Sequence, residues 1–541
     1  MNKIYASLML TLFICLNSCS DILDLSPRDK VSADVVLSSE EGVNMYLANL
    51  YYLLPVEDFG YMPRSGFRVS DNGIVAAMYS DEAVHSEFGE FGREGFDYWT
   101  SGYELIRKIN TLIGQIPDID VKTINNDELM GEALFLRAYT YFALVKRYGG
   151  LSVIDHVQEY TNDFEALKVT RSTEKETYDF ILHDLDDAII KLSTNITNSR
   201  RANKWVALAF KSRVALFAGS IAKYTHAPYL TLSGVAVDKK LVGIDAQYAD
   251  EYFKQCIDAS EEIVNSGKYG LYKPNPVNAQ EAAANYQKLF EDPNSVLDGV
   301  QEPIFIKGYT SGTDLTQNYD IWFRPNQLAN TWPHPGRLNP VLDLVDVYED
   351  YTDDGTGISR PIKSRVDNNE SNYSGFNPSV NYNHFPKSSP EAIFNGKDAR
   401  LFASLLLPGS TWKNTKIVIQ GGLVRTDGSH GSATGADGSV YYTFGSEKSD
   451  EYSGFATDQG NYTRTGFLFK KFLQETKEVQ PEGGKGDNDW IEIRMGEVLL
   501  NYAEAIAEYT QATQAMRSAG SVALNAVRKR AAHTDDIPLT G

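Results

Sequence analysis

Cys19 is the residue whose chemistry is easiest to assign from the sequence. Lys3 precedes an apolar run from Ile4 to Leu16, which is too short to cross a bilayer as a helix but fits the apolar region of a signal peptide. The run ends in Leu16-Asn17-Ser18-Cys19, the pattern of a lipoprotein cleavage site, where a thiol accepts a diacylglyceryl group. We therefore predict that Cys19 is the acylated first residue of the mature chain. The alternative is an ordinary secretory signal that contains a cysteine by chance.

The other two cysteines predict a fold without disulfides. Cys15 leaves with the signal peptide and Cys256 has no partner, so an exported chain of this length must rely on its hydrophobic core. No later apolar run approaches eighteen residues, so we expect the lipid on Cys19 to be the only membrane anchor.

Catalytic motifs are missing from the sequence. It contains no HExxH, CxxC or GxSxG pattern and no phosphate-binding GxxxxGK loop, so we predict no catalytic residue, no metal and no cofactor. The segment Asp350–Gly355 (DYTDDG) lacks the alternation of a calcium loop, and a capped turn is the better interpretation. The 72 acidic side chains leave open an acid–base pair at the separation found in glycosidases.

The net charge of −21 argues against nucleic acid as a partner, because phosphate backbones would be repelled. Neutral sugars remain compatible with this charge. Tyrosine outnumbers phenylalanine, 32 to 25, and tyrosine can stack through its ring while its hydroxyl stays hydrated. A surface that is simply rich in tyrosine would give the same count.

Apolar residues at helical spacing predict a mainly α protein. We expect helices at residues 38–54, 99–116, 127–148, 173–192, 203–223, 247–266, 488–509 and 511–532. The 127–148 segment has two apolar stripes, which is typical of a helix sandwiched between stacked neighbours. We expect 488–509 to bury one face only, and Trp99 and Trp490 to begin helices.

Residues 55–97 and 270–485 are rich in Gly, Pro, Asn and Asp and predict long loops with a few small strands and short helices. The Gly/Ser-rich stretch Thr426–Gly454 should be a surface excursion. Loops this long inside a compact protein are usually functional or disordered, and binding residues are more often found on loops than on helices. We therefore expect the functional site in these loops.

Ten segments in consistent order resemble the SusD/RagB family of nutrient-uptake lipoproteins. The most specific is LRAYTYFALVKRYGG at 136–150; others include KWVALAFKSRVALFAGS at 204–220, DWIEIRMGEVLLNYAEAIAE at 489–508 and LNAVRKRA at 524–531. The resemblance covers nearly the whole chain. Family members usually continue beyond the last of these segments, so the end at Gly541 suggests a truncated C-terminus.

The resemblance implies a fold, a location and a partner. The fold would be a TPR-like α-α superhelix with a large irregular loop region and a few short strands. The protein would face outward from the outer membrane and deliver glycans, or sometimes peptides, to a SusC-like TonB-dependent transporter. We divide the chain into a signal peptide at 1–18, an N-terminal helical domain at 19–225, a helix pair with its connecting segment at 226–300, and a C-terminal SusD/RagB domain at 301–541.

Glycan binding needs flat aromatic faces for sugar C–H groups, and amides or carboxylates for sugar hydroxyls. The candidates are loop residues: Trp322, Trp332, Tyr61, Phe67, Asp71, Asn72, Tyr79 and Trp412. Each could equally pack on its own domain. Arg137, Arg147, Asn501 and Glu504 lie on helices, and we expect them to be structural.

Three functions follow from these observations. The leading hypothesis is a binding protein that does not turn over its glycan. A secreted glycan-degrading enzyme would instead release reducing ends. A TPR scaffold that binds only protein would have no affinity for glycan and would present its ligand surface on helices.

Overall fold

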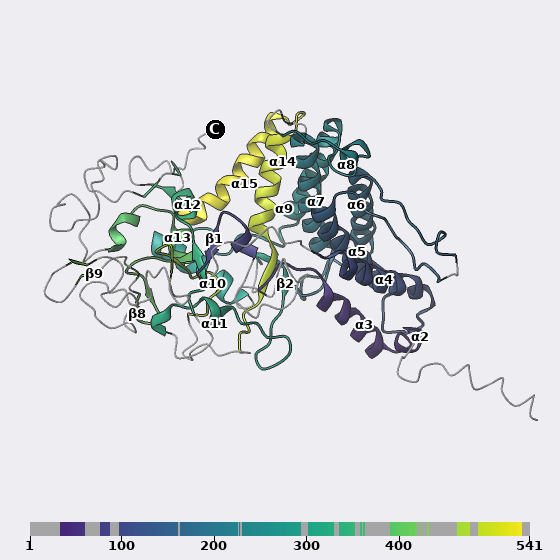
Figure 1. The fold of residues 1–541 in the computed structure, drawn as a ribbon, viewed down its shortest axis with the longest axis horizontal. Coiled ribbons are helices and arrows are strands. Elements are labelled where there is room, and N and C mark those ends of the chain that lie inside the picture. Colours follow the sequence, from purple (N-terminus) through teal and green to yellow (C-terminus); the bar gives the residue numbers. More distant parts are fainter. Residues whose placement is uncertain are drawn as a thin grey trace, which may run out of the picture.

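The computed structural model describes residues 33–59, 76–86, 97–160, 163–225, 227, 230–293, 301–328, 335–351, 358–359, 361–362, 390–417, 419, 423–424, 430–431, 463–475 and 485–532. Helices dominate this part of the chain, and its few strands are short, as predicted. In Figure 1, helices α3 to α7 form one half of the molecule on the right, and an irregular half lies on the left.

The helices and strands have the following bounds. The α-helices are α2 (Ala33–Val36), α3 (Glu40–Leu53), α4 (Trp99–Gln115), α5 (Asn126–Tyr148), α6 (Glu174–Lys191), α7 (Lys204–Tyr224), α8 (Val235–Asp238), α9 (Ala249–Ser266), α10 (Ala279–Glu291), α11 (Tyr319–Phe323), α12 (Leu342–Val347), α13 (Ala399–Ser404), α14 (Met495–Glu508) and α15 (Gln514–Ala532). The strands are β1 (Ala83–His85), β2 (Pro303–Lys307), β3 (Leu338–Pro340), β4 (Glu349–Asp350), β5 (Ile358–Ser359), β6 (Leu405–Leu406), β7 (Thr411–Trp412), β8 (Thr415–Lys416), β9 (Leu423–Val424), β10 (His430–Gly431), β11 (Leu468–Phe469) and β12 (Trp490–Arg494). Short 3₁₀ turns include η1 (Ala76–Tyr79).

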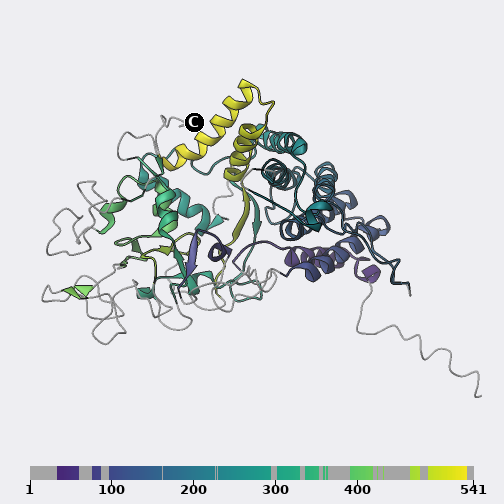
Figure 2. The ribbon, with the colours of Figure 1, turned by 45° about the horizontal axis from the view of Figure 1, so that its top comes forward.

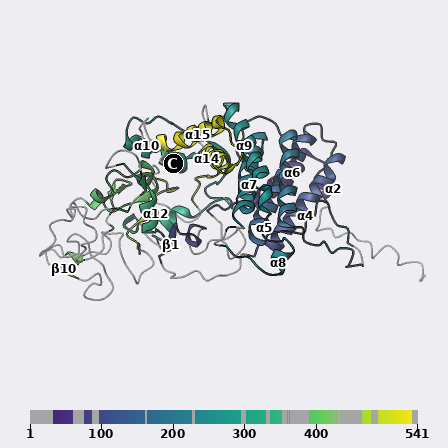
Figure 3. The ribbon, with the colours of Figure 1, turned by 90° about the horizontal axis from the view of Figure 1, so that it is seen from above.

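The helical half is a series of neighbouring helices, each packed against the next: α4 on α5, α5 on α6, α6 on α7, α7 on α9, α9 on α14 and α14 on α15. Seen from above, these helices lie side by side (Figure 3). The middle helix α5 is buried from Ala133 to Val145 on all sides, because α4 and α6 cover its two apolar stripes. This confirms the sandwiched helix that the sequence predicts.

Two glycines explain why α5 ends where it does. Gly149 has φ +68°, and a Cβ there would lie 2.1 Å from the carbonyl oxygen of Leu241. A Cβ on Gly150 would lie 2.1 Å from the carbonyl oxygen of Ser172. Only glycine permits this left-handed backbone and close approach without strain.

The predicted helix 488–509 was wrong in its first turn. Residues Trp490–Arg494 form strand β12, which pairs antiparallel with β2, so Trp490 begins a strand and not a helix. The sequence WIEIR alternates, and the structure buries Ile491 and Ile493 between more exposed neighbours. That period of two fits a strand, and α14 begins only at Met495. The β2–β12 pair lies between the two halves in Figure 1.

The irregular half contains several two-stranded antiparallel sheets and its own hydrophobic cluster. The sequence pattern did not reveal one helix of this half, α10. This helix has thirteen residues and begins with an Asn278 cap, whose side chain accepts from the Glu281 N–H. Helix α15 crosses from the helical half toward this irregular half (Figure 2). It packs against α10 and α13 there as well as against α14.

Of the four helix residues assigned to structure, Arg137 and Asn501 pair with residues on neighbouring helices, whereas Glu504 is exposed. Arg137 forms two hydrogen bonds with Asp184 on α6, at 2.7 Å and 2.8 Å. Asn501 donates to the Ser212 hydroxyl at 3.1 Å. Arg147 lies 3.7 Å from Glu57, which follows α3 and is not on a helix. Cys256 is a buried free thiol, as predicted, and burial raises its pKa to about 12.

Helix α7 corrects one expectation. It is long and apolar enough to meet the length and composition criteria for a membrane span, although the sequence analysis counted no such run. In the fold, 67% of that window is buried inside the protein. Its apolarity therefore matches its place in the core, between α6, α9 and α14.

Candidate functional site

The three predicted loop aromatics that the structure describes lie in or against one hydrophobic cluster of the irregular half. Trp322 on α11 is 7% exposed, and Trp412 on β7 is 0% exposed. Tyr79, at the end of η1, is half-buried and packs against the same cluster. Arg337 lies over the Trp322 ring, at 5.4 Å from its centroid. These three aromatic side chains therefore pack in or against the same hydrophobic cluster, and the two indole rings have little surface left for a ligand.

The remaining predicted glycan residues lie outside the described residues: Tyr61, Phe67, Asp71, Asn72 and Trp332. The same holds for residues 352–355 of the rejected calcium loop. Their role in binding stays a prediction.

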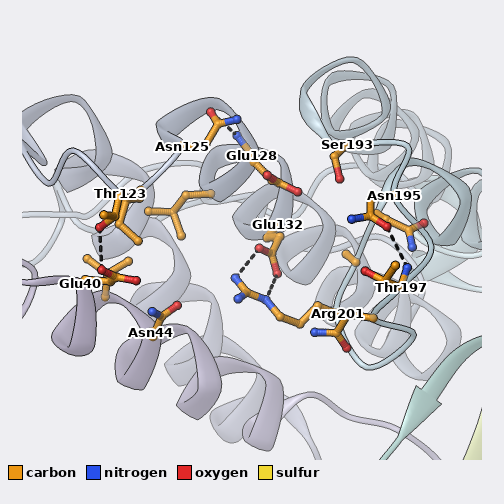
Figure 4. Close-up of a pocket in the computed structure, with 16 residues that line it drawn as sticks. Glu40, Asn44, Thr123, Asn125, Glu128, Glu132, Ser193, Asn195, Thr197 and Arg201 are labelled. Carbon is orange, nitrogen blue, oxygen red and sulfur yellow. Dashed lines mark hydrogen bonds and ion pairs between the residues drawn. The ribbon is translucent and has the colours of Figure 1, made fainter. Parts of the chain in front are cut away.

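A groove that the sequence analysis did not anticipate runs beside helix α3. Its first part is a hollow of about 400 Å³, bounded by α3, the first turns of α5 and the segment between α6 and α7 (Figure 4). Its second part is an adjoining hollow of about 500 Å³, bounded by the end of α3, β2 and Leu315. Asn44 and Arg201 line both hollows, so the two hollows lie next to each other. We call the two hollows together the α3 groove.

Three helix N-termini position the polar side chains of the α3 groove. Ser39 caps α3, Asn125 caps α5 and Asn203 caps α7, each by accepting hydrogen bonds from N–H groups of the following turn. Of these, Asn125 and Asn203 line the first hollow. Helices α5 and α7 therefore both begin beside the first hollow. Their polar capping residues form part of its lining for that reason.

The first hollow is lined mainly by amides, hydroxyls and carboxylates. These are Glu40, Asn44, Thr123, Asn125, Glu128, Glu132, Ser193, Asn195, Thr197, Asn198, Arg201 and Asn203. Thr123 donates to the Glu40 carboxylate at 2.7 Å, and the pair lies at one end of the hollow in Figure 4. Such side chains offer both donors and acceptors, which is what a ligand rich in hydroxyl groups requires.

An ion pair forms the floor between the two hollows. Arg201 donates to Glu132 through Nε (3.0 Å) and Nη2 (2.6 Å), in the bidentate geometry drawn in Figure 4. The Tyr51 hydroxyl donates to the same carboxylate at 2.6 Å and accepts from the Ala202 N–H at 2.8 Å. This network fixes α3, α5 and the α6–α7 segment relative to one another.

Burial dominates the electrostatics of this floor. Glu132 is 3% exposed, and burial raises the pKa of its carboxyl above the usual value, although the hydrogen bonds from Arg201 act in the opposite direction. Burial, followed by the negative charge of Glu132, raises the pKa of Tyr51 well above its usual value.

The second hollow adds apolar and aromatic surface. Tyr51, Tyr52, Leu47, Phe305 and Leu315 contribute to its lining, together with Arg200 and Lys307 at its edge. Tyr52, which also lines this hollow, is 43% exposed. An open groove with an accessible tyrosine beside amides and carboxylates can bind a sugar by stacking and hydrogen bonding.

Sequence reasoning missed the α3 groove because it searched loops for aromatic side chains. Tyr51, Tyr52 and Asn44 all fall in the helix predicted at 38–54, outside the loops that were searched. One available sign was the polar segment at 193–203, STNITNSRRAN, which is too rich in Asn, Ser and Thr for a simple turn between two apolar helices.

No metal-binding group was found in the part of the chain that the structure describes, where no three His, Cys, Asp or Glu side chains could hold an ion together. The α3 groove contains carboxylates but neither histidine nor cysteine.

The comparisons with known proteins place this architecture. A family model described as "Starch-binding associating with outer membrane" matches residues 21–216, and the model of the SusD family matches residues 301–538. The chain belongs to the SusD/RagB family. It is therefore a SusD-like protein associated with the outer membrane, in a family with a starch-binding description.

Individual relatives support the fold. SusD-like protein P38 of Formosa agariphila is 26% identical over 208 residues, which are 37% of this chain and 40% of that relative, so the match spans less than half of its length. A SusD-like protein from Bacteroides fragilis gives a TM-score of 0.63 at 22% identity, covering 95% of this chain and 83% of that one. A SusD-like carbohydrate-binding protein from the same organism gives 0.63 at 20% identity, covering 94% and 81%. The SusD-like helical fold is thus confirmed.

The expected C-terminal truncation receives no support from these matches, because the SusD family model reaches residue 538 of a chain of 541.

Proposed function

We propose that this protein is a surface lipoprotein, held in the outer membrane by acyl chains on Cys19, that captures oligosaccharides and passes them to a SusC-like TonB-dependent transporter. Family membership supports glycan binding and the location, and the leader sequence supports the anchor. Peptide is the alternative ligand. The helical half would contact the transporter, and the four-part division of the chain stated above remains part of this proposal.

We propose further that the α3 groove contributes to capture. The observation that carries this is the joining, through Asn44 and Arg201, of a hollow lined by amides and carboxylates to one that exposes the Tyr52 ring. Tyr52 would stack on the C–H face of a sugar, and Asn44 and Asn198 would bind its hydroxyl groups. Three carboxylates line the first hollow against one arginine, so that hollow favours a neutral sugar over an acidic one.

Affinity electrophoresis through gels containing neutral polysaccharides tests this role. Removing the stacking ring in Tyr52→Ala should weaken binding about two- to twelvefold, because an aromatic contact contributes about 0.5–1.5 kcal/mol. Asn44→Ala should have a smaller effect of the same sign. Tyr160→Ala is the matched control, because Tyr160 is 75% exposed and does not line the groove.

The same gels separate the α3 groove from the predicted loop residues. If Trp332→Ala abolishes retention while Tyr52→Ala and Asn44→Ala migrate like the wild type, the loops bind the glycan and the groove does not. If no polysaccharide retards the wild type, a scaffold that binds only protein becomes the better hypothesis.

The anchor has a separate test. Cells grown with labelled palmitate should incorporate the label into the wild type and not into Cys19→Ala. Equal labelling of both would reject Cys19 as the acylated residue.

A further inference from the structure

A group of basic side chains lies between the two halves of the molecule, far in sequence from the α3 groove. It consists of Arg400 on α13, Lys471 after β11, Arg494 at the end of β12 and Arg530 on α15, arranged around Tyr286 of α10. We call these five residues the basic cluster.

Ring contacts show how closely the basic cluster is assembled. The Tyr286 and Phe290 rings on α10 lie 5.0 Å apart. The Arg530 guanidinium lies 5.2 Å from the Tyr286 centroid, and Lys471 Nζ lies 4.2 Å from that of Phe290. Arg494 also lies over Phe290, at 5.7 Å. Several positive charges therefore share one small volume.

The carboxylates paired with the basic cluster are fewer than its cations. Arg494 and Arg530 share one carboxylate, that of Glu302, which is fully buried. Arg400 pairs with Asp398. Among the described residues, Lys471 has no carboxylate within ion-pair distance, and its ammonium lies over the rings of Phe290 and Phe472 instead. Two carboxylates thus serve four cations.

Arg530 provides the second, independent observation. Arg530 is 3% exposed. Among the described residues, its Nε and Nη2 atoms have no hydrogen-bond acceptor. Buried guanidinium donors without acceptors are costly, and proteins rarely leave them so. Two free donors on one planar group match the paired oxygens of an oxyanion.

The basic cluster remains open to solvent on one side. The side chains of Arg400 and Arg494 are 25% and 20% exposed to solvent. Tyr286 and Lys471 are also only partly buried. The positive potential reaches the Tyr286 phenol: burial alone would raise its pKa, but Arg494, Lys471, Arg530 and Arg400 outweigh burial and lower it. A negative charge placed here would be stabilised in the same way.

We propose that the basic cluster binds a small oxyanion, sulfate or phosphate, through the free donors of Arg530 and the ammonium of Lys471. The anion would complete the charge balance where α10, α13, β12 and α15 meet, and so hold the last helix against the irregular half. None of the residues of the basic cluster lines the α3 groove, so this is a separate site.

Thermal unfolding of the full chain in sodium sulfate or sodium phosphate, compared with sodium chloride at equal ionic strength, tests the proposal. A ligand that binds only the folded state raises the unfolding temperature with a saturable dependence on its concentration. We expect saturation with sulfate or phosphate and none with chloride. Glucose 6-sulfate forms a second arm, since tighter binding of the ester than of the free ion would identify a sulfated sugar as the source of the anion.

Two variants locate the binding. Lys471→Met should weaken the apparent affinity for sulfate at least tenfold. Arg530→Lys keeps a cation beside Glu302 while removing the two free donors, so it should weaken affinity without unfolding the chain. Lys254→Met is the control, because Lys254 is an exposed lysine of α9 paired with Asp258.

Three results would overturn the proposal. One is a sulfate response no larger than that of chloride. Another is an unchanged affinity in Lys471→Met and Arg530→Lys. The third is an absorbance band of ionised tyrosine at neutral pH that Tyr286→Phe removes, because a tyrosinate would then neutralise the basic cluster without a bound anion.

Discussion

Replacing Arg201 by methionine isolates the electrostatics of the α3 groove. The variant keeps most of the aliphatic length of the side chain but leaves Glu132, which is 3% exposed, without its bidentate cation. Removing one partner of a buried ion pair typically costs about 3–5 kcal/mol. Because Arg201 itself is partly exposed and water can enter its place, we expect about 3 kcal/mol at pH 8.

The pH dependence has a definite sign. Burial already places the folded-state pKa of Glu132 above its usual value of 4.5, and Arg201 is the main group that lowers it. In Arg201→Met the folded pKa therefore rises further above the unfolded one. A raised acid pKa means that the folded state binds more protons in that interval, so stability falls as pH rises through it. The destabilisation relative to wild type should be small near pH 4.5 and full above the folded pKa, at about 1.4 kcal/mol per unit of added shift.

Urea unfolding at several pH values, with Arg517→Met as the exposed-arginine control, measures the effect. The double variant Glu132→Gln/Arg201→Met should recover most of the lost stability and lose the pH dependence, because no buried charge remains. The reasoning is refuted if Arg201→Met is equally destabilised at pH 4.5 and pH 8, or if the double variant is no more stable than the single one.

Further predictions concern the fold. Gly149→Ala should cost at least about 1–2 kcal/mol in thermal unfolding, because its positive φ and the Leu241 oxygen at 2.1 Å both oppose a Cβ; an unchanged stability would contradict that geometry. Arg137→Met should cost about 3–5 kcal/mol by leaving Asp184 buried and unpaired, and Arg137→Met/Asp184→Asn should restore part of it. In a chain that begins after Cys19, Cys256 should react with Ellman's reagent only in denaturant, since burial raises its pKa to about 12; rapid reaction of the folded protein would be inconsistent with its position. Trp412→Ala should cost about 3–5 kcal/mol, and loss of glycan binding at unchanged stability would instead show that Trp412 contacts the ligand.

Helical periodicity predicted the helical half well, because each of its helices buries a continuous stripe. The sequence placed α5 at 127–148, and the structure has it at Asn126–Tyr148. The same reasoning failed at Trp490–Arg494. These five residues alternate as in a strand, but a true helix follows them directly, and the prediction extended that helix over them. Local pattern could not reveal the partner strand β2, which lies nearly two hundred residues earlier in the chain.

Helix α10 was missed for a related reason. The segment 270–485 was judged by its average content of Gly, Pro, Asn and Asp, and this average hid a capped, alanine-rich stretch of thirteen residues. A search for cap signals such as Asn278 followed by Glu281 could have found it.

The candidate site was less predictable than the fold. The α3 groove is assembled from α3, α5 and the segment before α7, and nothing in the sequence shows that Asn44, Glu132 and Arg201 meet. Trp322 and Trp412 were chosen because loop aromatics often bind sugars, yet both pack into one hydrophobic cluster. This cluster is built mostly from irregular segments and short elements, so no helix or strand pattern in the sequence predicts it. Which aromatic residues remain exposed depends on tertiary packing. In segments without regular secondary structure, the sequence has no periodicity from which the exposed side chains could be predicted.

Hydrogen–deuterium exchange, measured with and without a retained oligosaccharide, tests the central claim most directly. Binding in the α3 groove should slow exchange at residues 40–56 and 193–203 in the wild type, and much less in Tyr52→Ala at the same ligand concentration. Protection confined to residues 60–97 and 318–336, with no change beside α3, would contradict a role of the groove in glycan capture.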